Sequence, residues 1–314
     1  NLMVDYLVYG KIIVDVIRLL DGSVVRSVLG GGGPQGAFGA RLWDSSVGLL
    51  SRSGTDIEEN CSERLRELDI DLAGWMQYPD IPTPHGIMAY NEDEYINYQS
   101  QLGIDIDTLN RNLQQILAVP IELPESYQNP KVIHLITEYF DEDMVQTALD
   151  LKQKGAILSL EPLIDYREWT NRQSMHEFFK VAQTATPDWP SASGFAGSDE
   201  PLEVMKYWAK LGPDLVCVRH GSRGSYVWDK NHDEIWQIPP VKVNVIDPTG
   251  AGNSYGGGMS VGWHKTKNAL YAGCYGAISA SLIIREVGTP MMTSDLQTEA
   301  QALVPLALEQ AKKL

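Results

Sequence analysis

The stretch Asp247–Gly258 holds the residues with the clearest chemical signal in the chain. It reads Asp-Pro-Thr-Gly-Ala-Gly-Asn-Ser-Tyr-Gly-Gly-Gly. Glycines at this density allow successive backbone N–H groups to converge on a phosphate where a helix begins, because the helix N-terminus offers free donors and a partial positive charge. The stretch therefore predicts a phosphate-binding loop and phosphoryl-transfer chemistry.

Asn253 stands where such a loop would carry a carboxylate that accepts a proton. An amide has the shape of a carboxylate but accepts no proton at neutral pH. Loss of a positioned base costs roughly 10²–10⁴ in rate, about 3–5 kcal/mol of barrier. The loop thus predicts phosphoryl transfer, and this one residue leaves open whether the transfer still occurs.

The loop matches neither the Walker pattern GxxxxGK[ST] nor the dinucleotide pattern GxGxxG. We expect a strand over Val241–Ile246 before it and an apolar helix around Gly257–Lys265 after it. This order would direct the free N–H groups of the helix toward a ligand. The alternative is that the glycines only permit close packing of helices.

Short β-rich runs alternate with amphipathic helical stretches, which predicts a mainly parallel sheet with helices on both faces. The clearest helix is Glu142–Lys154, with Gly155 just after its end. Ser191–Asp199 is interpreted as a loop. Buried strands are expected at Tyr6–Tyr9, Ile12–Ile17, Val132–Thr137, Ala156–Leu160, Val181–Thr186 and Leu215–Arg219.

Two regions interrupt this alternation. Ser23–Ser27 follows the Asp21-Gly22 turn and resembles a short edge strand, and Pro82–Tyr98 alternates loosely around a turn at 91–93. We interpret them as strands of a small β-sheet that stands off the main body as a lid over a substrate cleft. The alternative is a surface hairpin with no role.

Composition and charge exclude several classes of function. The chain has 314 residues, 43% of them hydrophobic, as expected for a globular protein with a sizeable core. A net charge of −16 disfavours binding to nucleic acid or to anionic membranes. The apolar start, Leu2–Leu20, is interrupted by charges and fits neither a signal peptide nor a membrane span. Cys61, Cys217 and Cys274 have no metal-ligand spacing, so we expect free thiols in a reducing, cytoplasmic compartment.

Several of these motifs resemble those of a known family. Asp247–Tyr255 resembles the C-terminal signature DTxGAGDxF of the pfkB (ribokinase-like) sugar kinases, and Gly30–Gln35 followed by 40–42 resembles their N-terminal signature. Gly10 and Asp15 match the family's first strand, and Val218–Gly224 resembles the strand and turn beside its adenine nucleotide. The chain is identified as a diverged member with GAGN in place of GAGD.

The resemblance implies an α/β protein with the ribokinase-like three-layer α/β/α fold, in which a mainly parallel central sheet carries a small β-sheet lid. It implies one domain over residues 1–314, with lid strands within 15–30 and 82–100. The implied function is phosphorylation of a hydroxyl on a small sugar, polyol or nucleoside by ATP. Mg²⁺ and a monovalent cation are the implied cofactors, and a homodimer through the lid is the implied assembly. The alternative is a catalytically impaired pseudokinase that keeps ligand binding in a regulatory or scaffolding role.

The resemblance also implies roles for individual residues, grouped as anion hole, substrate site, nucleotide site and metal site. Asn253 takes the position of the base, and Asp247 would order the loop or a monovalent cation. The anion hole would be Gly250, Ala251 and Gly252; the substrate site Asp15, Gly31, Gly32 and Gln35; the nucleotide site Arg219, Gly221, Ser222, Gly224 and Asp247; and the metal site Glu161 and Asp188.

The sequence departs from the family pattern in three places. Besides Asn253, the NxxE motif should fall within Thr186–Ser191, where Asp188 could replace its Asn but Ser191 replaces its Glu. Pro34 and Gln35 stand where the first signature has its asparagine. Asn253 alone could be an engineered substitution that traps a complex, but three coincident departures favour a naturally diverged branch. They also favour the pseudokinase, whereas the intact Asp15 and glycine loop favour the enzyme.

A few other residues are candidates from their type alone. His85 and His134 could act as acid–base groups and His220 lies beside the nucleotide turn, although a lone histidine near a strand end is more often structural. Arg219 and Arg223 could meet ATP phosphates, with surface solvation as the alternative. Glu161 ends a strand at the carboxyl edge of the expected sheet, where ligands bind in open α/β sheets.

Overall fold

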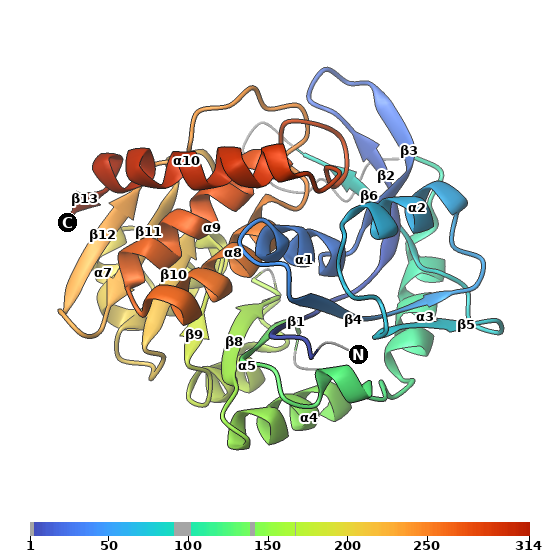
Figure 1. The fold of residues 1–314 in the computed structure, drawn as a ribbon, viewed down its shortest axis with the longest axis horizontal. Coiled ribbons are helices and arrows are strands. Elements are labelled where there is room, and N and C mark those ends of the chain that lie inside the picture. The colour runs from blue at the N-terminus through green and yellow to red at the C-terminus, as the bar shows by residue number, and fades with distance from the viewer. Residues whose placement is uncertain (1–2, 91–101, 139–141, 167) are drawn as a thin grey trace.

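The computed structural model describes residues 3–90, 102–138, 142–166 and 168–314 (Figure 1). Within these ranges one large sheet has the strand order β13-β12-β11-β10-β9-β8-β7-β1-β4-β5. The parallel part comprises β1 (Tyr6–Tyr9), β4 (Val47–Gly54), β5 (Trp75–Tyr78), β7 (Val132–Thr137), β8 (Ile157–Pro162), β9 (Thr184–Ala185) and β10 (Leu215–Arg219). Three antiparallel strands complete it, namely β11 (Ser225–Asp229), β12 (Glu234–Ile238) and β13 (Lys312–Lys313).

Helices cover both faces of this sheet. One face carries α1 (Gly33–Arg41), α2 (Glu59–Glu67), α8 (Ala251–Thr266), α9 (Ala269–Ile283) and α10 (Ser294–Gln310). The other carries α4 (Glu142–Gln153), α5 (Arg172–Phe179), α6 (Trp189–Ala196) and α7 (Pro201–Trp208). The helix α3 (Ile106–Leu117) packs beside β4, and short 3₁₀ turns lie at Glu125–Tyr127 and Gly221–Arg223.

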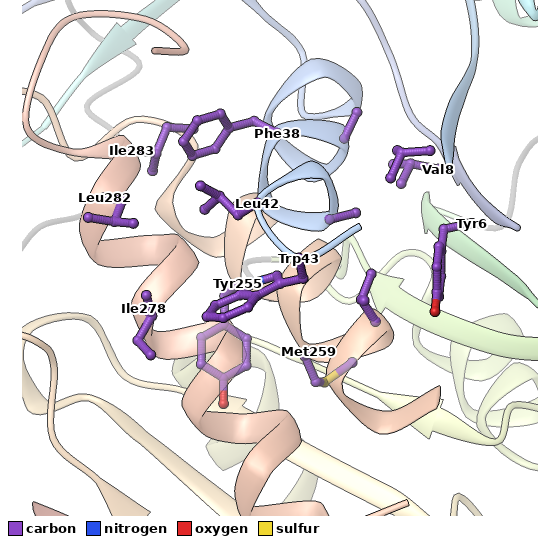
Figure 2. Packing of buried hydrophobic residues seen from close by; sticks show 14 of the residues in the cluster. Tyr6, Val8, Phe38, Leu42, Trp43, Tyr255, Met259, Ile278, Leu282 and Ile283 are labelled. Carbon is purple, nitrogen blue, oxygen red and sulfur yellow. The ribbon is translucent and has the colours of Figure 1, made fainter. Parts of the chain in front are cut away.

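The core divides at the sheet, because successive strand side chains point to opposite faces. On β1, Tyr6 and Val8 join the cluster under α1, α8 and α9, whereas Leu7 and Tyr9 join the cluster under α4 to α7. Figure 2 shows the first cluster, where Phe38 of α1 and Leu42 just after it lie near Leu282 and Ile283 of α9. The three-layer α/β/α architecture with a mainly parallel central sheet is thus confirmed.

A separate small sheet follows the order β3-β2-β6. Its strands are β2 (Ile13–Arg18), β3 (Val24–Gly30) and β6 (His85–Ala89); β2 runs antiparallel to β3 and parallel to β6. It stands at one side of the main body (Figure 1). The expected small sheet is therefore present, and the part of its second segment at 91–98, with the turn at 91–93, lies outside the described residues.

Several expected elements differ in the structure. Residues 241–246 form no strand: Val245 and Ile246 are exposed in a connecting segment, and Ile246 N donates to the Ile284 carbonyl at the end of α9. The expected loop at Ser191–Asp199 is mostly the helix α6, since the side chain of Asp188 accepts a hydrogen bond from Ser191 N and caps the helix. The expected strand at Ile12–Ile17 belongs to the small sheet instead of the central one.

Other expectations hold with small shifts. The helix after the glycine loop begins at Ala251, and the strand at 181–186 shortens to Thr184–Ala185. Gly155 follows α4 with a positive φ of 106°, as a residue that ends a helix in the left-handed region. Cys61, Cys217 and Cys274 are buried and free. None of the helices in the described ranges combines the length and apolarity needed to cross a membrane.

Candidate active site

The glycine loop lies at the N-terminus of α8, as expected. Gly250 caps the helix with φ 82°, a conformation that favours glycine, and Ala251 and Gly252 form its first turn. The later glycines serve packing: a Cβ at Gly256 would lie 2.6 Å from His134 Nε2, and one at Gly257 would overlap the Gly36 carbonyl of α1. Packing therefore explains the later glycines, whereas phosphate binding by Gly250, Ala251 and Gly252 stays a prediction.

Asn253 is held by a buried carboxylate. Its Nδ2 donates a hydrogen bond of 2.7 Å to Oε1 of Glu161, whose side chain is only 1% exposed at the end of β8. Asn253 also lies against Gly32, where a Cβ would be 3.1 Å from its Nδ2. The residue at the position of the usual base thus stands between the turn of the first signature and the carboxyl edge of the main sheet.

Three side chains from parallel strands of the main sheet lie close together here. His134, Glu161 and Arg219 occupy β7, β8 and β10 and point to the face covered by α8. The Arg219 guanidinium donates through Nε and Nη2 to the Thr186 carbonyl, and its Nη1 lies 3.6 Å from Glu161 Oε1. His134 Nε2 lies 3.5 Å from Glu161 Oε2, and neither atom has a hydrogen-bond partner among the described residues.

Arg219 also borders the glycine loop. A Cβ on Gly252 would overlap its Nη1 atom. A cation at this place, beside the free N–H groups of a helix N-terminus, suits a phosphate. Arg219 is therefore a candidate ligand for the phosphate, as the sequence predicts. Its position beside Glu161 is not predicted by the sequence.

Asp15 lies on β2 of the small sheet and is buried, with 4% exposure. Burial, with a smaller contribution from the negative charge of Asp247, raises the pKa of Asp15 to about 8. Gly30 and Gly86 make room for its carboxyl group, since a Cβ at Gly86 would lie 2.7 Å from Oδ1. A carboxyl group enclosed in this way suits hydrogen bonding to substrate hydroxyls.

Gly31, Gly32 and Gln35 form the turn into α1. Both glycines have positive φ, 96° and 98°. The Gln35 side chain holds the turn, because its Oε1 accepts from Gly32 N at 3.0 Å and its Nε2 donates to the Leu29 carbonyl at 2.9 Å. The structure thus shows partners for Gln35 inside the protein, and substrate binding by these residues stays a prediction.

The expected nucleotide residues Gly221, Ser222 and Gly224 form the turn between β10 and β11. Gly224 has φ 86°, and its missing side chain admits the Ile238 carbonyl of β12. The hydroxyl of Tyr255 on α8 donates to Ser225 Oγ at 2.9 Å, which connects the glycine loop's helix to this turn. The turn and the loop therefore lie at the same end of the molecule.

Asp247 begins the glycine loop and is 1% exposed. Its Oδ1 accepts from Thr249 N at 3.0 Å, whereas the buried Oδ2 has no hydrogen-bond partner among the described residues. Thr249 in turn accepts a 3.0 Å hydrogen bond from the hydroxyl of Tyr90, the residue after β6. A hydrogen bond thus connects the segment that follows the small sheet to the glycine loop.

The two expected metal residues are placed differently. Oε1 of Glu161 already accepts from Asn253 and faces Arg219, whereas Oε2 has no hydrogen-bond partner among the described residues. Asp188 uses Oδ1 to cap α6, where it accepts from Ser191 N at 2.9 Å. The described part of the chain holds no group of three or more His, Cys, Asp or Glu that could bind a metal alone. This donor set fits Mg²⁺ that takes most of its ligands from nucleotide phosphates and water.

Three further side chains were either given a low priority in the sequence analysis or not considered there. His85 contacts the Thr83 carbonyl and Glu58, which gives it a structural place away from the glycine loop. From the sequence, a structural role was favoured for His134, yet its side chain lies beside Glu161. The two side chains are close because β7 pairs with β8. Lys11, next to Gly32 in the backbone, forms an ion pair with Glu138 and was not singled out.

Comparisons with known proteins agree with this geometry. A cytidine kinase from Thermococcus kodakarensis is 26% identical over 264 residues, covering 84% of the chain and 90% of that protein. An inositol 3-kinase from Arabidopsis thaliana is 23% identical over 327 residues, covering 94% of the chain and 79% of that protein. A solved structure of a putative ribokinase II from E. coli, in complex with ATP and Mg²⁺, superposes with a TM-score of 0.71 at 17% identity, covering 97% of the chain and 100% of that one.

The structural likeness confirms the ribokinase-like fold. The family described as pfkB family carbohydrate kinase matches residues 3–295, nearly the whole chain. With both signatures placed at one site, the chain belongs to the pfkB family of carbohydrate kinases.

Proposed function

We propose that the protein transfers the γ-phosphoryl group of ATP to a hydroxyl of a small sugar, polyol or nucleoside. The observation that carries this proposal is the meeting of three parts at one place. The Gly250–Gly252 helix terminus, the Gly31–Gly32 turn and the Asn253 side chain lie together, with Arg219 beside them. This arrangement offers donors for a phosphate next to residues that could hold its acceptor.

The acceptor would be held by the small sheet. Asp15 offers its carboxyl group to substrate hydroxyls, and the Gly31–Gly32 turn allows a close approach of the backbone. The small sheet acts as a lid in this proposal, because its Tyr90 donates to Thr249 of the phosphate loop. Closure would exclude water and so favour transfer to the acceptor over hydrolysis of ATP.

The transfer itself would depend on positioning and charge. The acceptor oxygen forms a bond to the γ-phosphorus in line with the departing ADP, while the bond from that phosphorus to the β–γ bridging oxygen breaks. The amides of Gly250, Ala251 and Gly252 and the guanidinium of Arg219 stabilise the charge that develops on the phosphoryl oxygens. Mg²⁺, with Asp188 as its candidate protein ligand, would neutralise charge on the nucleotide phosphates.

Asn253 accepts no proton at neutral pH, so we propose a transfer without a protein base. The amide would orient the acceptor hydroxyl, and the hydroxyl proton would end on the transferred phosphoryl group, whose second pKa is about 6. The reaction then balances without a proton acceptor from the protein. Because the transition state is largely dissociative, the acceptor oxygen needs little activation before it attacks.

The nucleotide would lie over the turn at 221–224, with Gly221, Ser222 and Gly224 along it and Arg219 near the phosphates. Asp247 would order the phosphate loop, and its buried Oδ2 suits a monovalent cation, since that atom has no hydrogen-bond partner in the described ranges. The names of the relatives, a cytidine kinase and an inositol 3-kinase, support both nucleosides and polyols as acceptors. They give no support to a non-catalytic descendant.

The test is a search for product by mass spectrometry. The protein would be incubated with Mg-ATP and pools of nucleosides, inositols and sugars, with matched samples that contain a chelator or ADP instead of ATP. We expect one pool to yield a mass increase of one phosphoryl group that depends on both ATP and the metal. ATP hydrolysis without any phosphorylated acceptor, from protein that binds ATP, would contradict the proposal.

A further inference from the structure

A buried hydrogen bond couples the residue at the base position to a carboxylate from another strand. Asn253 Nδ2 lies 2.7 Å from Glu161 Oε1, and the Glu161 side chain is 1% exposed. The carboxylate can only accept, so the NH₂ end of the Asn253 amide must face it. The amide orientation is therefore set by Glu161, and the remaining polar atom of Asn253 is Oδ1.

The charges around this pair allow one carboxylate but not two. Arg219 Nη1 lies 3.6 Å from Oε1 of Glu161, and His134 Nε2 lies 3.5 Å from its Oε2. An aspartate at position 253 would place a second carboxylate at hydrogen-bond distance from the buried carboxylate of Glu161. Two carboxylates so close cannot both ionise without a strong penalty. Asn253 and Glu161 are thus matched to each other.

We propose that Asn253 and Glu161 work as one unit, in which Glu161 supplies the single negative charge of the pair and holds the Asn253 amide. Glu161 is then a positioning residue that directs Oδ1 of Asn253 toward the acceptor hydroxyl. Asn253 packs against Gly32, and its Oδ1 lies 3.4 Å from the place that a Cβ on Gly32 would occupy, beside the Gly31–Gly32 turn. The inference rests on the proposed function for its catalytic part only, because the matching of the two side chains is a property of the fold.

The matched pair and the simple loss of a base predict opposite effects of Asn253→Asp on activity. If Asn253 only lacked a carboxylate, Asn253→Asp would raise activity. If the two residues are matched, Asn253→Asp lowers activity, and it does so because Glu161 is present. The double variant Asn253→Asp/Glu161→Gln exchanges the two groups: it keeps one carboxylate, one NH₂ donor and the hydrogen bond between them.

The experiment measures kcat and KM for the wild type, Asn253→Asp, Glu161→Gln and the double variant, with the thermal midpoint of unfolding for each. We expect each single variant to lose about 10-fold or more in kcat, with KM for ATP within about 3-fold of wild type. The double variant should recover to within about 3-fold of wild-type kcat or exceed it. Asn253→Asp should also unfold at least about 3 °C lower, and the double variant should regain that loss.

The two readouts separate this inference from the proposed function. Recovery of both kcat and the unfolding midpoint in the double variant supports the proposal that Asn253 and Glu161 work as one unit. Non-additive midpoints without product from any of the four proteins would support the matched pair and contradict the kinase. An Asn253→Asp variant that is more active than both the wild type and the double variant, or additive changes in both readouts, would overturn the inference.

Discussion

The guanidinium of Arg219 occupies the space that a side chain at position 252 would need. A Cβ on Gly252 would overlap Nη1 of Arg219, whose Nε and Nη2 are fixed by the Thr186 carbonyl. The glycine at the first turn of α8 therefore does more than relax the backbone. It admits a cation to the point where the helix presents its free N–H groups, so one small residue brings together two groups that can bind a phosphate.

This relationship predicts a large effect of the smallest possible substitution. Gly252→Ala should reduce kcat by about 100-fold or more, because either Arg219 or the loop has to move from the phosphate position. Steady-state kinetics with the identified acceptor would measure it. Gly262→Ala on the same helix is the control, since its Cβ would meet Ala272 and Tyr275 far from the loop and should affect stability more than kcat. Equal kcat losses in both variants would contradict a specific role for position 252.

Arg219 should also stabilise the fold through Glu161. Arg219→Met leaves the buried carboxylate without its cation, and we expect a loss of about 3 kcal/mol in the free energy of unfolding. In a Glu161→Gln background the same substitution should cost much less, because no buried charge remains. Urea denaturation of the four proteins measures the difference. Equal costs in the two backgrounds would show that Arg219 acts only through Thr186.

Asp15 predicts a specific pH dependence of stability. Its folded pKa of about 8 lies above the ordinary value of 3.8, so between these values the folded state keeps a proton that the unfolded state has lost. The free energy of unfolding should then fall as the pH rises from about 4 to about 8, by up to about 1.4 kcal/mol per pH unit from this group. Asp15→Asn should remove that slope.

The measurement is urea denaturation of wild type and Asp15→Asn at several pH values, in tetramethylammonium buffers that leave Asp247 without a small counter-ion. The wild type should lose stability relative to the variant as the pH rises. Two parallel curves would mean that Asp15 is ionised in the folded protein throughout this range.

Tyr90 tests the connection between the small sheet and the phosphate loop. Tyr90→Phe removes the hydroxyl that donates to Thr249 Oγ1 at 3.0 Å. We expect kcat/KM for the acceptor to fall about 2- to 10-fold, the usual contribution of one hydrogen bond, with the fold intact. Tyr271→Phe, exposed on α9, is the matched control. Identical kinetics for Tyr90→Phe and wild type would show that the Tyr90–Thr249 hydrogen bond does not contribute to acceptor turnover.

The parts of the fold that follow local rules could be predicted from the sequence. The strands at Tyr6–Tyr9, Val132–Thr137 and Leu215–Arg219 were expected at these bounds, because their apolar runs are buried on both faces. The expected strand at 241–246 is absent because this segment contacts the end of α9, through Ile246 N and the Ile284 carbonyl, a contact that no local pattern contains. The helix α6 was missed because its low-propensity residues concealed the cap at Asp188.

In the candidate site, too, features formed by consecutive residues could be predicted and contacts between distant residues could not. The glycine loop was visible as a motif, since its chemistry lies in consecutive residues. The partners of Asn253 were not, because Glu161 is 92 residues away in sequence and meets it only when β8 ends under α8. Glu161 was expected to bind metal, yet its hydrogen bond to Asn253 depends on sheet register and burial, which no local pattern contains.

The most direct test of the central claim follows the phosphoryl group itself. The protein would be incubated with its acceptor and Mg-ATP labelled with ¹⁸O in the γ-phosphoryl group, and the products would be analysed by mass spectrometry beside Gly252→Ala. The account predicts an acceptor phosphate that carries the labelled phosphoryl oxygens from the wild type and little from the variant. Label found only in inorganic phosphate, or acceptor phosphate formed equally by both proteins, would contradict it.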